Sequence, residues 1–137
     1  MKMKLPSRSQ RMLLPPSIDE FVGPDHRVRI VVEVVERLDL SAFDEGDART
    51  GRPRLPPEAL SSVLLYAFSI GVFSSREIAR RVETDCAFMY ATAGLQPSYR
   101  TLSRFRREHE TALSGVFAQV VVVCQRAGLG GPDVVVI

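Results

Sequence analysis

Apolar residues recur at helical spacing along the first half of the chain. Between Pro24 and Asp39, Val28, Val31, Val35 and Leu38 lie three or four residues apart, whereas a half-buried strand would alternate every second residue. A run of valines also suits a strand, but Glu33, Glu36 and Arg37 occupy the other face of a helix drawn through this stretch. The pattern therefore predicts a helix whose inward positions are Val28, Val31, Val32, Val35 and Leu38.

The most apolar helix is predicted to begin at Pro57. Proline fits the first turn of a helix because its missing N–H is not needed there. The residues that follow, up to Ile70, leave little polar surface, and a helix of this kind belongs in the centre of a bundle. Residues 39–57 are polar and rich in Asp, Gly and Pro, which indicates a connector.

Two short helices are predicted next, each with its own start signal. Ser74 and Glu77 have the spacing of a capping box, in which each side chain accepts from the other residue's backbone N–H. Asp85 is expected to cap a second helix that runs through Ala93. Gly94 would end it, since glycine readily adopts the left-handed conformation that follows a helix.

The helix predicted from Ser98 to Arg107 concentrates positive charge. At about 100° per residue, Arg100, Arg104 and Arg107 share one face, opposite Leu102, Phe105 and His109. Two short helices followed by a basic amphipathic helix are the outline of a helix-turn-helix, whose last helix enters the major groove of DNA. A plain solvated face is the alternative, and from spacing alone it is the more common explanation.

Other arginines add to the candidate DNA-binding set. Arg76 and Arg80 share a face of the preceding short helix. Arg52, flanked by Arg49 and Arg54 in the connector, is a candidate for holding phosphate. Arginine suits bidentate contact with phosphate and with guanine. Phosphate contacts position a protein on DNA, whereas contacts with base edges specify sequence.

The end of the chain departs from the helical pattern. A longer helix is predicted from Glu108 to Ala127, with Gly128 ending it. Val134 to Ile137 then form a β-branched run after a Gly-Gly-Pro break, which predicts a strand. A strand cannot satisfy its backbone alone, so its partners belong to another chain or are missing. The expected fold is all-α: a compact multi-helix domain with a helix-turn-helix-like segment and an orphan C-terminal strand.

Composition excludes several classes of protein. Of the 137 residues, 45% are hydrophobic and 25% are charged, as in a soluble globular domain, and a net charge of +2 decides nothing about nucleic acid. The apolar stretch from Val63 to Phe73 is far shorter than a membrane span. We therefore expect a cytoplasmic protein with no membrane partner.

No catalytic or metal site emerges from the sequence. Cys86 and Cys124 are far apart, and a zinc site needs about four such ligands. Asp25 and His26 are neighbours, and neighbours on a helix do not face the same way. We expect Asp25 to cap a helix beside a surface histidine. Neither a cofactor nor a small-molecule substrate is expected.

The same features predict three parts of the chain. Residues 1–16 are interpreted as a flexible basic arm that carries Lys2, Lys4, Arg8 and Arg11. Residues 17–128 form the helical DNA-binding domain. Residues 129–137 are the beginning of a further domain.

Several blocks of the chain resemble the N-terminal domain of DDE insertion-sequence transposases. The resemblance runs from Leu13 to Ile137, and the order and spacing of its blocks are more specific than any one of them. The blocks are Leu14–Val22, Pro24–Arg29, Gly51–Pro53 with Pro57 and Leu60, Leu64–Tyr66, Gly71, Ser74–Ile78 and Thr101–Arg106.

The resemblance implies a role in DNA transposition. Such a domain would recognise double-stranded terminal inverted repeats of a mobile element and help to pair transposase subunits as a homodimer. A ribonuclease-H-like domain would follow, in which three carboxylates hold two divalent metals such as Mg²⁺ for phosphoryl transfer. The chain stops where the first of these aspartates is expected, so we expect no catalytic activity from it alone. The alternatives are a nonfunctional truncated remnant and a subunit-pairing module.

Overall fold

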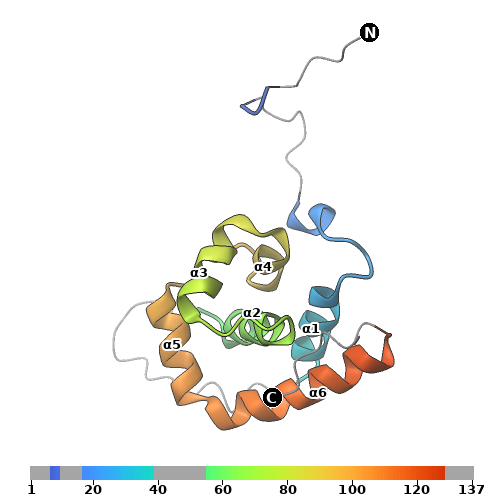
Figure 1. Cartoon of the computed structure of the whole chain (residues 1–137), viewed down its shortest axis with the longest axis vertical. Helices are drawn as coiled ribbons and strands as arrows, with labels where there is room; N and C mark the ends of the chain where they lie inside the picture. The colour runs from blue at the N-terminus through green and yellow to red at the C-terminus, as the bar shows by residue number, and fades with distance from the viewer. Residues whose placement is uncertain (1–6, 10–16, 39–54, 129–137) are drawn as a thin grey trace.

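The structure is a computed structural model that describes residues 7–9, 17–38 and 55–128 (Figure 1). These residues contain helices and no strand, which confirms the all-α class for the described part of the chain. The strand predicted at residues 134–137 lies outside it. The elements are a 3-10 helix η1 (Ile18–Phe21) and the α-helices α1 (Arg27–Glu36), α2 (Pro57–Ser69), α3 (Ser75–Thr84), α4 (Cys86–Ala91), α5 (Tyr99–Glu108) and α6 (Glu110–Arg126).

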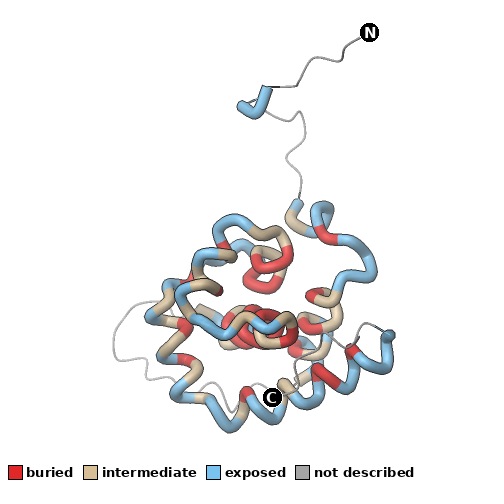
Figure 2. Tube along the Cα trace, in the orientation of Figure 1, coloured by how far each residue is buried: buried red, intermediate tan, exposed pale blue. Residues whose placement is uncertain are grey.

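Helix α2 lies in the middle of the bundle, as its composition predicted. It contacts α1, α3, α4, α5 and α6, and Figure 1 shows it surrounded by them. Every residue from Leu60 to Ala67 is buried, which Figure 2 shows as a continuous buried segment. A helix enclosed on all sides has no solvated face, so the 3.6-residue alternation seen elsewhere is weak here.

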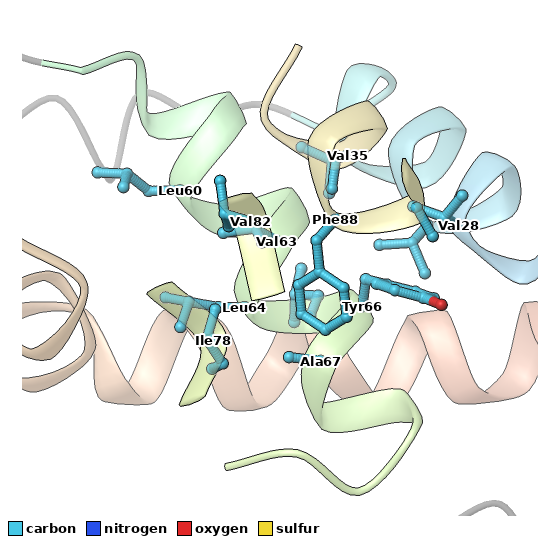
Figure 3. Packing of buried hydrophobic residues seen from close by; sticks show 14 of the residues in the cluster. Val28, Val35, Leu60, Val63, Leu64, Tyr66, Ala67, Ile78, Val82 and Phe88 are labelled. Atoms are coloured by element: carbon cyan, nitrogen blue, oxygen red, sulfur yellow. The ribbon is translucent and has the colours of Figure 1, made fainter. Parts of the chain in front are cut away.

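The core is closed by side chains from the helices around α2. Leu64 of α2 lies near Ile78 of α3, and Phe88 of α4 approaches Tyr66 (Figure 3). The ring centroids of Tyr66 and Phe88 are 5.1 Å apart and their planes meet at 70°, which is the edge-to-face arrangement that aromatic pairs favour. Burial raises the pKa of Tyr66 to about 12.

The start of α1 differs from the prediction. His26, and not Asp25, is the N-cap: its Nδ1 accepts a hydrogen bond from the backbone N–H of Val28 at 3.1 Å. The imidazole also lies 5.8 Å from the ring of Tyr66. A histidine in the extended conformation can therefore supply the acceptor that Asp or Ser usually provides, and the expected capping role of Asp25 is wrong.

Arg29 of α1 hydrogen-bonds to residues 19–23, which come just before the helix. Its guanidinium donates to the Asp19 carboxylate at 2.7 Å and to the carbonyl oxygens of Val22 and Gly23 at 2.7 and 2.8 Å. Its Cζ lies 5.0 Å from the ring centroid of Tyr90 in α4. The hydrogen bond to Asp19 raises the pKa of Arg29. This part of the chain, which carries the block Pro24–Arg29, therefore has a structural role.

Candidate nucleic-acid interface

Helix α5 divides into a buried and an exposed face, as its spacing predicted. Ser98 caps it, with its Oγ accepting from the backbone N–H of Thr101 at 3.2 Å. Leu102 and Phe105 are buried against the rest of the bundle. Among the residues left exposed are Arg100, Arg104 and Arg107.

Arg106 has a different environment from the other arginines of α5. Its Nη1 donates to the carbonyl oxygen of Phe73 and, at 3.2 Å, to the hydroxyl of Ser75. Its Cζ lies 4.9 Å from the ring centroid of Phe68 in α2. Burial lowers the pKa of Arg106. The side chain therefore ties α5 to the turn between α2 and α3, and so fixes how the two basic helices meet.

Helix α3 begins at the predicted cap, but the capping box is only half formed. The Ser74 Oγ accepts from the backbone N–H of Glu77 at 3.3 Å. The Glu77 carboxylate instead accepts from Arg80 at 2.6 and 3.0 Å and from Arg81 at 2.9 Å. Hydrogen bonds from Arg80, and then from Arg81, lower the pKa of Glu77 to about 2. Arg80, a predicted DNA-binding residue, is thus already paired with a carboxylate.

Two predicted residues from different helices come together at Tyr99, the first residue of α5. The Cζ of Arg76 in α3 lies 4.1 Å from the centroid of the Tyr99 ring. The Nε of Arg100 donates to the Tyr99 hydroxyl at 3.3 Å. Sequence reasoning missed Tyr99, because its contact with Arg76 joins positions that no local pattern links.

Arg104 and Arg107 form no hydrogen bond or ion pair with any residue that the structure describes. Both guanidinium groups are exposed on α5, so an anion could reach them without breaking an existing pair. Arg52, with Arg49 and Arg54, lies outside the described residues. Of the predicted DNA-binding residues, Arg104 and Arg107 are therefore exposed without an ion-pair partner among the described residues, Arg80 is paired with Glu77, and Arg52 lies outside the described part of the chain.

The packing of α3, α4 and α5 only partly follows a helix-turn-helix outline. Asp85 both ends α3 and caps α4, accepting from the backbone N–H of Ala87 at 2.9 Å. Helix α4 ends at Ala91, earlier than predicted, and Ala93 and Gly94 follow with left-handed φ values of 52° and 85°. Residues 92–98 then lead to α5, which packs against α3 (Figure 1).

Neither a metal site nor a membrane span is found in the described part of the chain. Its residues contain no group of three or more His, Cys, Asp or Glu side chains that could hold a metal ion. None of its helices is long and apolar enough to cross a bilayer. Cys86 and Cys124 are free thiols, and burial raises the pKa of Cys124.

Comparison with known families decides what kind of domain this is. Residues 16–108 match the model of a family described as a transposase domain, DUF772. The chain belongs to this transposase-domain family. The matched residues run from just before η1 to the last residue of α5, so the family region includes all the arginines of α3 and α5. No curated protein and no solved structure matches the chain.

Proposed function

We propose that this transposase domain binds double-stranded DNA at the ends of a mobile element through the exposed face of α5. The observation that carries the proposal is the pair Arg104 and Arg107, which are exposed and without an ion-pair partner among the described residues. Arginine donors suit both phosphate oxygens and guanine edges. In a transposase-family domain, DNA is the anionic partner that such a face would meet.

The proposal assigns different tasks to different parts of the chain. Residues 17–128 are the DNA-binding domain, in which α5 provides the contact face and Arg106 fixes its angle against α3. Residues 1–16 add basic charge, Arg52 contributes a phosphate contact, and residues 129–137 begin a further domain. The protein acts in the cytoplasm, where its DNA target is accessible.

We also propose that this chain holds DNA without cleaving it. Two-metal phosphoryl transfer needs a cluster of carboxylates, and the described residues bring no such cluster together. Incubation of the purified chain with a repeat-end duplex and Mg²⁺ or Mn²⁺ should leave the duplex intact. Metal-dependent nicking that co-purifies with the chain would contradict this.

Fluorescence anisotropy tests DNA binding most simply. The wild-type chain is titrated with a labelled duplex that carries the inverted repeat flanking its gene, and with a scrambled duplex, at two salt concentrations. Arg104→Ala with Arg107→Ala is compared with Arg37→Ala with Arg126→Ala, which removes two exposed arginines from the ends of α1 and α6. Removing one phosphate-binding arginine should reduce the salt slope by about 1, so the first variant should bind less tightly and the second should bind nearly as the wild type does.

Sequence recognition has its own outcome in this experiment. If α5 reads bases, the repeat binds more tightly than the scramble, and the Arg104/Arg107 variant loses that preference. Equal, strongly salt-dependent binding of both duplexes would mean that the face is electrostatic and not sequence-specific. No binding by the wild-type chain would contradict the proposal.

Subunit pairing is a second candidate function, favoured by the apolar surface around α6. Val122 and Val123 on this helix are 44% and 37% exposed. A groove of about 690 Å³ between α5, α6 and the turn before α3 is lined by Phe68, Phe73 and Phe117. Sedimentation equilibrium should then show a homodimer that Val122→Asn weakens. A strict monomer at high concentration would exclude this function.

A further inference from the structure

Tyr99 is an aromatic residue that the hydrophobic core does not use. It is half-buried at the first position of α5 and does not belong to the cluster of core side chains, which takes its buried aromatic rings from Tyr66, Phe88 and Phe105. Its ring and hydroxyl instead contact two exposed guanidinium groups, those of Arg76 and Arg100. A ring placed in this way contributes little to core packing and instead contacts the guanidinium groups of the two arginines.

The two arginines meet Tyr99 in different ways. The guanidinium carbon of Arg76 is 4.1 Å from the ring centroid, which is stacking distance. That of Arg100 is 5.8 Å away, and its Nε donates to the phenolic oxygen. A guanidinium stacked on a ring keeps its N–H edge in the plane of the group, so stacking leaves the edge available to an anion. Neither arginine forms an ion pair with a described residue.

We propose that Tyr99 is a positioning residue that holds Arg76 and Arg100 as one clamp for a phosphodiester of the DNA backbone. This inference rests on the proposed function, because it needs DNA to bind near α5. Free arginine side chains lose rotamer freedom when they bind, and groups already held in place lose less. Tyr99 therefore raises affinity by restricting the arginines before DNA arrives, while the positive charge itself comes from Arg76 and Arg100.

A positioning role for Tyr99 predicts different effects on affinity and on the salt slope from those of a purely structural role. Tyr99→Leu removes both the ring and the hydroxyl but leaves both charges, so affinity should fall while the salt slope stays near the wild-type value. Arg76→Ala with Arg100→Ala removes the charges that neutralise this one phosphate, so the slope itself should fall by about 1. In that double-alanine background Tyr99→Leu should have no further effect on affinity, since there is nothing left for it to position.

Tyr99→Phe separates the two halves of the clamp and guards against loss of folding. It keeps the ring that stacks with Arg76 and removes the oxygen that accepts from Arg100. Its affinity should fall between wild type and Tyr99→Leu, and in an Arg100→Ala background Tyr99→Phe should bind as Tyr99 does. Thermal melting followed by circular dichroism identifies any variant that loses affinity because it unfolds. If Tyr99→Leu is such a variant, the test rests on Tyr99→Phe.

Duplexes with single neutral methylphosphonate linkages identify the phosphate. At one linkage the substitution should weaken both the wild-type chain and Tyr99→Leu, which keep the two charges, but not the variant Arg76→Ala with Arg100→Ala. Wild-type binding that neither Tyr99→Leu nor Tyr99→Phe weakens would overturn this inference and leave the proposed function standing. Failure of the wild-type chain to bind any duplex would overturn both.

Discussion

Arg80 and Arg81 of α3 have different surroundings from Arg104 and Arg107 of α5. In α3, the Glu77 carboxylate accepts hydrogen bonds from both Arg80 and Arg81. In α5, Arg104 and Arg107 have no ion-pair partner among the described residues. Sequence spacing alone would give both helices a basic stripe. The difference arises because Glu77 lies three and four residues before Arg80 and Arg81, the spacing at which side chains on one helix meet.

The sharpest contrast is within α5, between Arg106 and Arg107. Arg106→Ala removes hydrogen bonds to Phe73 and Ser75 and the contact with Phe68. Hydrogen bonds from a charged group contribute about 2 kcal/mol, so we expect a decrease of about that size in the free energy of unfolding. Arg107→Ala should change it by no more than about 0.5 kcal/mol. Urea unfolding followed by circular dichroism measures both free energies. Equal decreases for the two variants would contradict the different roles of Arg106 and Arg107.

The comparison between the two helices is tested by Arg104→Ala and Arg80→Ala. Both variants change the net charge by the same amount, so a difference between them reports direct contact with DNA. Arg104→Ala should lower the salt slope of binding by about 1. Arg80→Ala should lower it less, because Glu77 already neutralises that guanidinium. A larger effect from Arg80→Ala would reverse the assignment of the two helices.

Removing the carboxylate should make α3 resemble α5. Glu77→Gln releases Arg80 and Arg81 from an ionised partner and should tighten DNA binding modestly, with a steeper salt dependence. Glu36→Gln, at an exposed position on α1, makes the same change in net charge at a distance and is the matched control. If anisotropy showed the same increase in DNA affinity for both variants, the increase would come from overall net charge and not from the release of Arg80 and Arg81.

The smallest expected effect is on stability at acid pH. The pKa of Glu77 is lowered from 4.5 to about 2 in the folded domain, so its ionised form stabilises the fold above about pH 4.5. That contribution is lost as the pH falls through about 2. Because the pair is exposed, solvent screens it and the effect is small. The difference in melting temperature between wild type and Glu77→Gln should therefore shrink from pH 5 to pH 2, and a constant difference would contradict this origin.

The elements that could be predicted from sequence are those set by local signals. The buried helix after Pro57, the beginning of α5 near Ser98 and the two faces of α5 depend on periodicity and on residues within one turn of each other. Gly94 and Gly128 have the left-handed conformations expected at helix ends, with φ values of 85° and 76°.

The features that could not be predicted depend on which side chains meet in space. His26 takes the capping role expected of Asp25. The contact of Arg76 with Tyr99 crosses from one helix to another. Local patterns identified the arginines of the candidate site, and the spacing of Glu77 before Arg80 and Arg81 is itself a local signal. The contacts of Arg76 and Arg106 join different helices and have no such signal.

Chemical-shift mapping shows whether DNA contacts the exposed face of α5. The uniformly ¹⁵N-labelled chain is titrated with the repeat-end duplex, and amide shifts are followed residue by residue. We expect the largest changes along the exposed face of α5, at Arg104 and Arg107, extending to Tyr99 and Arg76. Changes confined to α1 and α6, with α5 unaffected at saturation, would contradict this expectation.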